Sequence, residues 1–422
     1  MQDNVADKII KELPKPIVDL IQTAGRAAPK SGAAIYMVGG IVRDLLLGRQ
    51  SKDIDIMVES DALDVARSMS GILASKPIIH KRFSTATFKF NDYRVDLATC
   101  RSEIYDAPGS LPKVKPGSIE QDLFRRDFTV NAMAIRINQK RFGELIDLYG
   151  GRQDLENKLI RILHEKSFID DATRIMRSVR YEQRLDFKLE RKTARLLHRD
   201  LDMLDRISGD RLRHEVILWL SEPQPAKILK RAARLGVLSK LHPALFWDPL
   251  LVKAFRNANR MSIDFPPVQL YLALLVYNLD RKQLGEFLER LNIKGGELDE
   301  IARQTVSLKI NQESLDYRPL QPSEIYQKLQ CYKTAAIQAN KLCTPSRDVR
   351  INLRLYLDKL RFVRTHLNGR ELKAMGVLQG KKMGITLDRL LTARLDGEVK
   401  TKADEQQLAL QFLRDLKAKG MQ

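Results

Sequence analysis

Apolar residues follow two different spacings along the chain, and the change falls near residue 150. Between residues 33 and 150, short runs rich in β-branched residues alternate with turns, which is typical of strands in a mixed α/β domain. The predicted strands cover residues 34–38, 53–58, 85–90 and 94–99, and a helix over 41–47 separates the first two. The first 30 residues alternate apolar pairs with charges, which predicts a short amphipathic helical lead-in.

Helical spacing replaces the strand pattern beyond Gly151, and no further strand is expected there. Helices are predicted over residues 170–182, 190–198, 209–220 and 225–241, with more helices to the end. Prolines at 243, 266, 267, 319 and 322 mark breaks within this region. The pattern therefore predicts an α+β fold, in which a small N-terminal mixed α/β head with a β-sheet precedes an elongated all-α region.

The composition is that of a globular protein, with 422 residues and 44% apolar residues, and the length predicts two to four domains. The longest near-continuous apolar stretch, residues 271–277, is far shorter than the roughly 18–20 residues of a membrane span, so no membrane is expected as a partner. The N-terminus has no basic-then-apolar leader, and the 3 cysteines are far apart and odd in number. These features argue against secretion and a disulfide framework, and they predict a cytoplasmic protein.

Lysine and arginine outnumber aspartate and glutamate by 73 to 53, which gives a formal net charge of +20. Such an excess indicates a polyanionic partner, and nucleic acid is favoured over an anionic membrane because no lipid-seeking segment is present. A generally solvated basic surface is the alternative. Charge alone therefore identifies neither the partner nor a reaction.

A double glycine joins the first predicted strand to the first predicted helix of the head, in residues 38–48, VGGIVRDLLLG. Gly39 and Gly40 allow the backbone to approach a phosphate closely, and a helix N-terminus offers free N–H groups and a positive dipole end. Arg43, just inside the helix, is placed to add a bidentate phosphate contact.

Two aspartates, Asp53 and Asp55, lie two residues apart on the second predicted strand, so both side chains project from one face. Carboxylates so placed can hold two Mg²⁺ ions about 3.5–4 Å apart, the geometry that stabilises the attacking and leaving oxygens in phosphoryl transfer. Asp96, on another apolar strand, is a candidate third carboxylate. Asp-x-Asp is also common on exposed strand faces, but the glycines upstream and the acid downstream favour a metal site.

Four ordered motifs resemble those of the class II (bacterial-type) tRNA nucleotidyltransferases and their poly(A) polymerase relatives, in the polymerase-β-like nucleotidyltransferase superfamily. They are GGIVRDLLLG with DID at 53–55, RRDFTVNAMA at 125–134, DLYGG followed by DL and KLIR over 147–161, and DDATRIMRSVR at 170–180. The resemblance implies that Arg126 and Asp127 of the second motif contact the sugar and phosphates of a nucleotide. It also implies four parts, which are a catalytic head (1–150), a helical neck for base recognition (151–222), and a body (223–345) and tail (346–422) that bind tRNA.

The fourth motif carries the specificity argument, because Asp171, Arg174 and Arg177 recur every three residues on one side of a predicted helix. A carboxylate at 171 accepts hydrogen bonds and a guanidinium at 174 donates them, which matches the edge shared by cytosine and adenine but not guanine or uracil. Arg177 and Arg180 would be free for the triphosphate. A salt-bridged helix face is the alternative. The family's first acid is Glu where this chain has Asp170, so the role of Asp170 is less certain.

Two other segments extend the resemblance, and a basic cluster stands apart from it. Residues 101–112 are similar to a flexible loop of the relatives that add the terminal A, although an ordinary surface connection explains them equally well. Residues 206–215, RISGDRLRHE, resemble the last family motif, a helix that supports the nucleotide pocket. A cluster of Lys227, Lys230, Arg231 and Arg234 is suited to following an RNA backbone by charge, or is a solvated helix face.

We therefore expect a template-independent RNA nucleotidyltransferase that adds CMP, AMP or both from CTP and ATP to the 3′ end of tRNA and releases pyrophosphate. Asp53 and Asp55 would hold Mg²⁺, and Gly40, Arg43, Arg126 and the other arginines named above would position the sugar and phosphates. The alternatives are a CC-adding or A-adding enzyme, a bacterial poly(A) polymerase, or an RNA-binding protein that has lost catalysis. The intact carboxylate pair argues against the last, and no obligate protein partner is expected.

Overall fold

The computed structural model describes residues 4–27, 33–73, 76–80, 84–104, 112–316 and 319–418. They pack as two compact units, one made of Met1–Glu215 with Arg231–Lys240 and the other of Val216–Lys230 with Leu241–Gln422. All strands of the described chain lie in the first unit, which confirms the α+β fold with its sheet in the N-terminal head. The division into a head, neck, body and tail stays a prediction.

The first unit is built on a seven-stranded mixed sheet in the order β3-β4-β5-β2-β1-β8-β9. Its strands are β1 (Ile35–Val38), β2 (Asp53–Val58), β3 (Ile78–His80), β4 (Thr85–Phe90), β5 (Tyr93–Thr99), β8 (Ala134–Arg136) and β9 (Leu145–Ile146). β2 runs parallel to β5, and the other neighbours are antiparallel. Because β1 is antiparallel to β2, with Val38 opposite Asp55, the turn that leaves β1 lies beside the start of β2.

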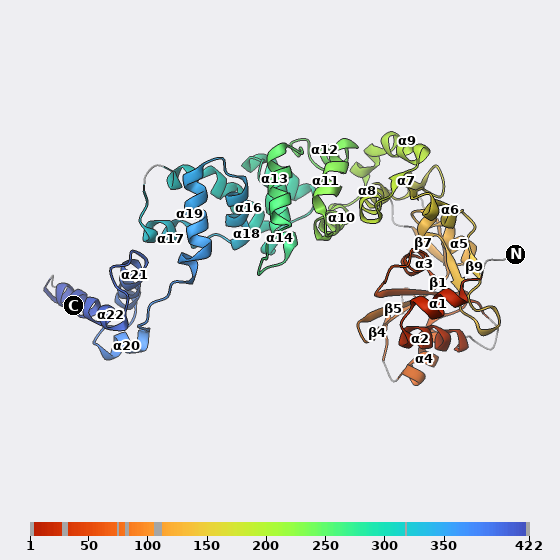
Figure 1. Ribbon diagram of the computed structural model, residues 1–422, viewed down its shortest axis with the longest axis horizontal. Coiled ribbons are helices and arrows are strands. Elements are labelled where there is room, and N and C mark those ends of the chain that lie inside the picture. Colours follow the sequence, from red (N-terminus) through yellow and green to blue (C-terminus); the bar gives the residue numbers. More distant parts are fainter. Residues whose placement is uncertain are drawn as a thin grey trace. The chain divides into compact units, whose positions relative to one another are not determined.

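Alternate residues of each strand point to opposite faces of the sheet, so apolar side chains lie on both faces and helices pack against them. The helices of this region are α1 (Ala6–Glu12), α2 (Lys15–Arg26), α3 (Gly40–Leu46), α4 (Ala62–Leu73) and α5 (Ile119–Phe124). Tyr36 and Val38 of β1 pack with Ile119 and Leu123 of α5 in one core cluster. α4 packs against β4 and β5, and it lies beside α2 (Figure 1).

Several short strands lie outside the four that the sequence pattern predicts. β6 (Arg101–Ile104) and β7 (Lys113–Pro116) form a separate antiparallel ribbon. The expectation of no strand beyond Gly151 is wrong, because β10 (Leu159–Ile160) pairs in parallel with β11 (Lys188–Leu189). Strands of two residues are too short to show a period of alternation, so tertiary pairing alone defines them.

The helices over residues 151–241 differ from the predictions at their ends. They are α6 (Gly151–Glu156), α7 (Ser167–Asp170), α8 (Thr173–Leu185), α9 (Arg191–Arg199), α10 (Gly209–Ser221), α11 (Pro225–Arg234) and α12 (Val237–Leu241). The helix predicted over 225–241 is broken at Gly236, whose φ of 75° is outside the helical region. The helix predicted over 170–182 is also divided, because Asp171 between α7 and α8 has extended angles, φ −139° and ψ 98°.

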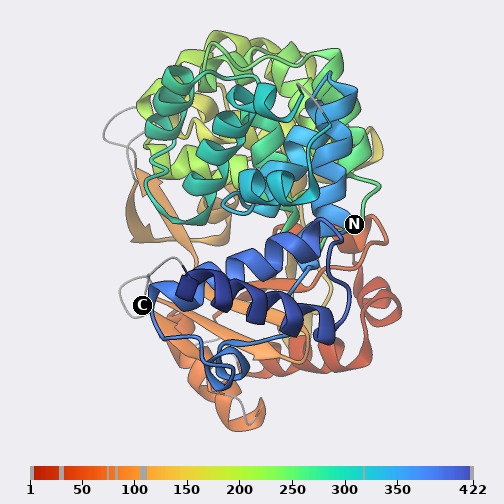
Figure 2. The ribbon, with the colours of Figure 1, turned by 90° about the vertical axis from the view of Figure 1, so that its left-hand side faces the viewer.

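The second unit is helical throughout its described part. Its further helices are α13 (Pro249–Ala258), α14 (Pro267–Val276), α15 (Arg281–Arg290), α16 (Gly296–Ile310), α17 (Pro322–Leu329), α18 (Thr334–Cys343), α19 (Arg347–Asp358), α20 (Gly369–Ala374), α21 (Lys381–Leu395) and α22 (Lys402–Ala418). Leu308, Leu329 and Leu353 join α16, α17 and α19 in one core cluster. α21 and α22 lie side by side (Figure 2). Within the described residues, none of the helices combines the length and apolar character needed to cross a bilayer.

Candidate active site

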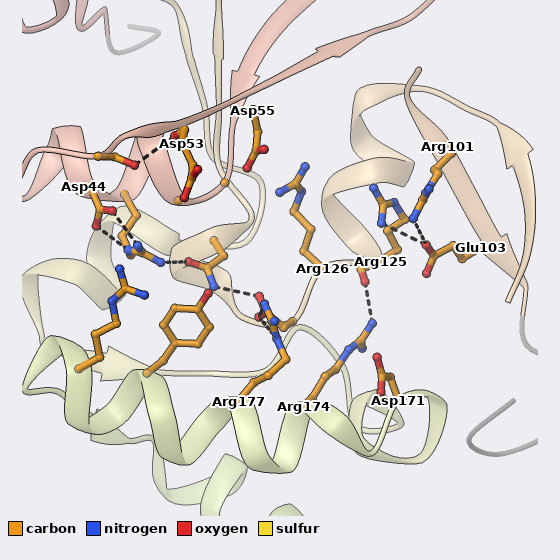
Figure 3. Close-up of a pocket in the computed structure, with 18 of the residues that line it drawn as sticks. Asp44, Asp53, Asp55, Arg101, Glu103, Arg125, Arg126, Asp171, Arg174 and Arg177 are labelled. Atoms are coloured by element: carbon orange, nitrogen blue, oxygen red, sulfur yellow. Dashed lines mark hydrogen bonds and ion pairs between the residues drawn. The ribbon is translucent and has the colours of Figure 1, made fainter. Parts of the chain in front are cut away.

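A cavity of about 510 Å³ lies in the first unit, between the start of β2, the turn after β1 and helix α8 (Figure 3). Eight arginines and six carboxylates line it, from segments as far apart in sequence as Gly39 and Arg211. Of the predicted site residues, the lining includes Gly39, Gly40, Arg43, Asp53, Asp55, Arg126, Asp127, Asp171, Arg174 and Arg177. Asp96 and Arg180 are not among the described residues that line it.

The double-glycine turn brings the backbone against two side chains of the cavity. Gly39 has φ 73°, a conformation that L side chains rarely adopt. A Cβ at this position would lie 2.7 Å from Nη1 of Arg126 and 3.6 Å from Oδ2 of Asp55. The glycine therefore makes room for a guanidinium and a carboxylate at the same time, and α3 begins directly after it at Gly40.

We expect Gly39→Ala to lower both stability and activity, because the new Cβ would displace Arg126 in addition to straining the backbone by about 1–3 kcal/mol. Gly48→Ala is the matched control, since Gly48 also has a positive φ of 66° but its Cβ would meet no described atom within 4 Å. Melting temperature should fall for both variants, whereas kcat/KM for the nucleotide addition expected from the sequence should fall about tenfold to a hundredfold for Gly39→Ala only. Equal losses of kcat/KM in both would show that the contact with Arg126 is unimportant.

Asp53 and Asp55 start β2 and face the same cavity, as their spacing predicts (Figure 3). Asp96 lies directly opposite Asp55 on β5, but its oxygens are engaged elsewhere. Its Oδ1 accepts a hydrogen bond from Thr87 Oγ1 at 2.5 Å, and its Oδ2 pairs with Arg94 Nε at 2.9 Å. The arrangement brings two carboxylates to the cavity and holds the third beside them on the neighbouring strand.

The carboxylate pair fits a hard divalent cation. Within the described ranges, no group of three or more His, Cys, Asp or Glu side chains has metal-binding geometry. Mg²⁺ is commonly bound by one or two carboxylates, with waters and substrate phosphates as its other ligands. Burial raises the pKa of Asp55, and the negative charges of Asp96 and Asp53 add to this effect, while Arg126 opposes it. A cation at this position would stabilise a carboxylate that the protein otherwise destabilises.

We expect Asp55→Asn to raise the melting temperature at pH 7 without divalent metal. A carboxyl with a raised pKa binds its proton more tightly in the folded state, so its charge destabilises the fold above the folded-state pKa. The gain should shrink as the pH falls through that pKa toward the unfolded value near 4, because Asp55 then becomes neutral. Scanning calorimetry with EDTA tests this, and Asp53→Asn at the exposed neighbouring position is the control. A lower melting temperature for Asp55→Asn at pH 7 would contradict the dominance of burial.

Arg43 lines the cavity but is paired with other side chains, and its predicted bidentate phosphate contact stays a prediction. Its Nε and Nη2 donate to the two carboxylate oxygens of Asp44 at 2.9 and 2.8 Å, and its Nη1 donates to Asn131 Oδ1 at 2.6 Å. The side chain is 3% exposed. Buried guanidinium groups need partners to offset desolvation, and the adjacent Asp44 supplies one locally.

Arg177 is paired in this structure and not free as expected, and its contact with a triphosphate stays a prediction. Its Nε and Nη2 donate to Asp127 Oδ2 at 2.9 and 2.7 Å. Asp127 also accepts from Asn131 Nδ2 at 3.0 Å, which links this pair to Arg43. Burial by itself raises the pKa of Asp127, but the charge of Arg177 and the hydrogen bond from Asn131 outweigh it and lower the pKa below its usual range.

Arg180 is also not free, because it is buried beside Tyr181 and Glu215. Its Nη2 lies 3.6 Å from Glu215 Oε2, and its guanidinium carbon lies 5.4 Å from the centre of the Tyr181 ring. Arg43 and Arg177 approach the same ring at 5.3 and 5.5 Å. Each of these arginines also has a carboxylate partner, and the Tyr181 ring adds cation–π attraction to all three.

Asp171 and Arg174 both line the cavity, although they do not share a helix as predicted. Arg174 lies in the first turn of α8, whereas Asp171 lies in the extended link before it. Arg174 donates through Nη1 to Ser167 Oγ at 2.8 Å and through Nη2 to the carbonyl oxygen of Arg125 at 2.6 Å. The carboxylate of Asp171 instead binds Arg211 of α10, with a distance of 2.6 Å between Nη2 and Oδ1.

Sequence reasoning missed several residues of the cavity. They are Asp44, Ser51, Arg101, Glu103, Pro112, Arg125, Asn131, Tyr181, Arg184 and Arg211. Most of them lie in or next to motifs that the sequence already singles out. Closeness in sequence to a predicted site residue was therefore the signal that could have found them. Residues 105–111 of the predicted flexible loop lie outside the described residues, and the flanking segments form the β6–β7 ribbon.

Comparison with known proteins identifies the family. A family model described as the poly A polymerase head domain matches residues 35–161, and one described as a probable RNA and SrmB-binding site of polymerase A matches residues 186–247. An A-adding tRNA nucleotidyltransferase of Geobacter sulfurreducens is 33% identical over 95% of this chain and 48% of its own length. The chain thus spans about half the length of the first curated relatives that it matches.

Solved structures match the chain along nearly its whole length. The apo form II structure of a CCA-adding enzyme has a TM-score of 0.82 and 31% identity, and covers 97% of this chain and 98% of its own. The Thermotoga maritima CCA-adding enzyme complexed with tRNA has a TM-score of 0.77 and 30% identity, with 97% and 99% covered. With these matches, and with three of the four motifs lining one cavity, the chain belongs to the class II (bacterial-type) tRNA nucleotidyltransferase and poly(A) polymerase family.

Proposed function

We propose that the chain is a template-independent RNA nucleotidyltransferase that adds CMP, AMP or both to the 3′ end of tRNA. The observation that carries this proposal is the cavity that combines the strand carboxylates Asp53 and Asp55 with eight arginines. A nucleoside triphosphate is complementary to the arginines, and the carboxylates suit the metal ion that accompanies it. A relative named an A-adding tRNA nucleotidyltransferase and a solved complex of a CCA-adding enzyme with tRNA support tRNA as the acceptor.

In the proposed reaction, the 3′-hydroxyl of the RNA loses its proton to solvent and its oxygen bonds to the α-phosphorus of CTP or ATP. The bond from the α-phosphorus to the bridging oxygen of the β-phosphate breaks, and pyrophosphate leaves. Asp53 and Asp55 would hold Mg²⁺, which supplies charge stabilisation for the attacking and leaving oxygens when it is bound. Asp96, with both oxygens engaged by Thr87 and Arg94, would act by adding negative charge next to Asp55.

The arginines would bind the triphosphate by exchanging partners. Arg126 already lies against Gly39 and near Asp55, where the phosphates would meet the metal site. Arg177 would leave Asp127 for a phosphate, because a triphosphate offers more negative charge than one carboxylate. Asp127 would then accept a hydrogen bond from a ribose hydroxyl. Arg180, outside the cavity lining, would act by holding Tyr181 and Glu215 in place.

Asp171 and Arg174 would select the base. An ionised carboxylate only accepts hydrogen bonds and a guanidinium only donates them. Cytosine and adenine offer an amine beside an acceptor nitrogen, whereas guanine and uracil offer a carbonyl beside a protonated nitrogen. The pair would therefore accept CTP and ATP and reject GTP and UTP, with protein in place of a template.

An enzyme that adds only A is the second candidate, since a relative matched over 95% of the chain carries that name.

The basic helix α11 would contact the tRNA backbone through its exposed Lys227, Lys230 and Arg234, whereas Arg231 is bound to Glu182 at 2.6 Å. A cytoplasmic location stays a prediction.

The test is to incubate the purified protein and Mg²⁺ with tRNAs that end before, within and after CCA, with each labelled NTP supplied separately. We expect CMP addition to tRNA without CCA, AMP addition to tRNA ending in CC, and no extension of a complete end. Addition of AMP only, to the CC end only, would identify an A-adding enzyme, and an indefinite A tail a poly(A) polymerase. Intact tRNA binding with no incorporation of any nucleotide would overturn the proposal in favour of an RNA-binding protein.

A further inference from the structure

The two oxygens of the Asp171 carboxylate have different surroundings. Oδ1 accepts three hydrogen bonds, from the backbone N–H of Thr173 at 2.9 Å, from the Thr173 hydroxyl at 2.6 Å and from Nη2 of Arg211 at 2.6 Å. Oδ2 accepts none from the residues that the structure describes. The side chain is 22% exposed and lines the cavity, so Oδ2 is the oxygen that remains for a ligand.

The three donors restrain the carboxylate from two directions. Thr173 belongs to the same turn as Asp171, and both of its donors approach from the start of α8. Arg211 comes from α10, 40 residues later, and its charge-assisted bond is stronger than a neutral one. The terminal torsion of an aspartate is broad, so a restraint from outside the turn narrows the orientation of the carboxylate and with it the direction in which the open oxygen points.

Arg174 is the hydrogen-bond donor of the proposed base-reading pair Asp171–Arg174, and its position is fixed independently of Arg211. Arg174 is 4% exposed, and its two terminal nitrogens are held by Ser167 and the carbonyl oxygen of Arg125. Its position is therefore set by α7 and the segment after α5. A base that uses both Asp171 and Arg174 needs them in a constant relative position, and Arg211 is the tertiary contact that fixes the acceptor half.

We propose that Arg211 is a positioning residue for base selection. By occupying Oδ1 of Asp171 it leaves Oδ2 as a single, oriented acceptor for the exocyclic amine of cytosine or adenine. This inference rests on the proposed function, because it takes Asp171 as the group that reads the base. It adds a residue from the RISGDRLRHE segment at 206–215, for which the sequence predicts only support of the pocket.

A purely structural role for Arg211 has different consequences. If the Arg211–Asp171 bond only braces α10 against the link between α7 and α8, its loss weakens binding of every nucleotide to the same extent. If it orients Oδ2, its loss affects only those nucleotides whose base carries the amine. The two roles are therefore separated by changing the base as well as the protein.

The experiment measures kcat/KM of wild type and Arg211→Gln for CTP, ATP and their analogues without the amine, which are the triphosphates of pyrimidin-2-one riboside and purine riboside. We expect a loss of about tenfold or more for CTP and ATP, the usual effect of removing a hydrogen bond to a charged group, and little change for the analogues. The preference of the wild type for the amine-bearing bases would then largely disappear. Arg211→Lys, which retains the charge, should restore part of it.

Arg213→Gln is the matched control, because Arg213 is on the same helix, pairs with Asp210 at 2.7 Å and is not among the described residues that line the cavity. It should behave as wild type. An equal loss for all four nucleotides in Arg211→Gln would overturn the inference in favour of a brace, and so would a wild type that uses CTP and ATP no better than the analogues. A wild type that incorporates neither CTP nor ATP would instead overturn the proposed function.

Discussion

Replacing Asp55 with asparagine should reduce nucleotide incorporation by about a thousandfold or more while leaving tRNA binding close to the wild-type level. Asparagine has the same size, so the cavity keeps its shape, but it lacks the charge that would hold Mg²⁺ beside the reacting phosphate. A metal ion supplies several kcal/mol of transition-state stabilisation, and each 1.36 kcal/mol corresponds to about tenfold in rate. Single-turnover incorporation of labelled AMP measures the reaction, and fluorescence anisotropy of labelled tRNA measures binding.

Asp53→Asn should behave similarly, and Asp96→Asn provides the informative comparison. Asp96 lies opposite Asp55, but its oxygens are engaged by Thr87 and Arg94 and it does not line the described part of the cavity. We therefore expect a smaller loss for Asp96→Asn than for either strand neighbour. Activity retained by Asp55→Asn would exclude the metal assignment, and an equal loss for Asp96→Asn would place Asp96 among the ligands.

Asp171→Asn should change the group that residue 171 favours on the base, from the exocyclic amine of cytosine or adenine to the carbonyl oxygen of uracil or guanine. Thr173 and Arg211 donate three hydrogen bonds at Oδ1, so the amide oxygen of asparagine must occupy that position. The amide nitrogen then takes the place of Oδ2 and turns an acceptor into a donor. We expect kcat/KM for CTP and ATP to fall by about a hundredfold or more, because the base amine would face a second donor.

In this variant, kcat/KM for UTP and GTP should rise relative to kcat/KM for CTP and ATP, since the carbonyl oxygens of uracil and guanine suit a donor. The switch stays incomplete because Arg174 still donates toward a protonated ring nitrogen. Competition between labelled nucleotides for one tRNA end measures the ratio directly. An unchanged preference would show that Asp171 does not read the base. An exchange of the charges at 171 and 174 is a poorer test, because a carboxylate at 174 would face the oxygens of Ser167 and Arg125.

Strand β2, which carries the carboxylate pair, and the turn beside it were predictable because they depend on local spacing. Asp53 and Asp55 alternate with buried Ile54 and Ile56, which places both carboxylates on one face of β2. The short strands β8 to β11 were not predictable, because two or three residues show no periodicity and exist only through pairing with a distant segment. The break before α8 was missed for a related reason, since Asp171 has a helical spacing but an extended backbone.

The fold class, the carboxylate pair, the glycine turn and the set of arginines were readable from the sequence, since each follows from residue type and short-range order. The partner of each charge depends on the tertiary packing. Arg177 meets Asp127 across 50 residues, and Arg211 meets Asp171 across 40, so both pairs depend on how α8 and α10 pack in the first unit. A buried charge must find a partner to offset its desolvation. For that reason, arginines that a linear pattern leaves free for phosphate are paired in the folded chain, and the open oxygen of Asp171 is defined by a residue from another helix.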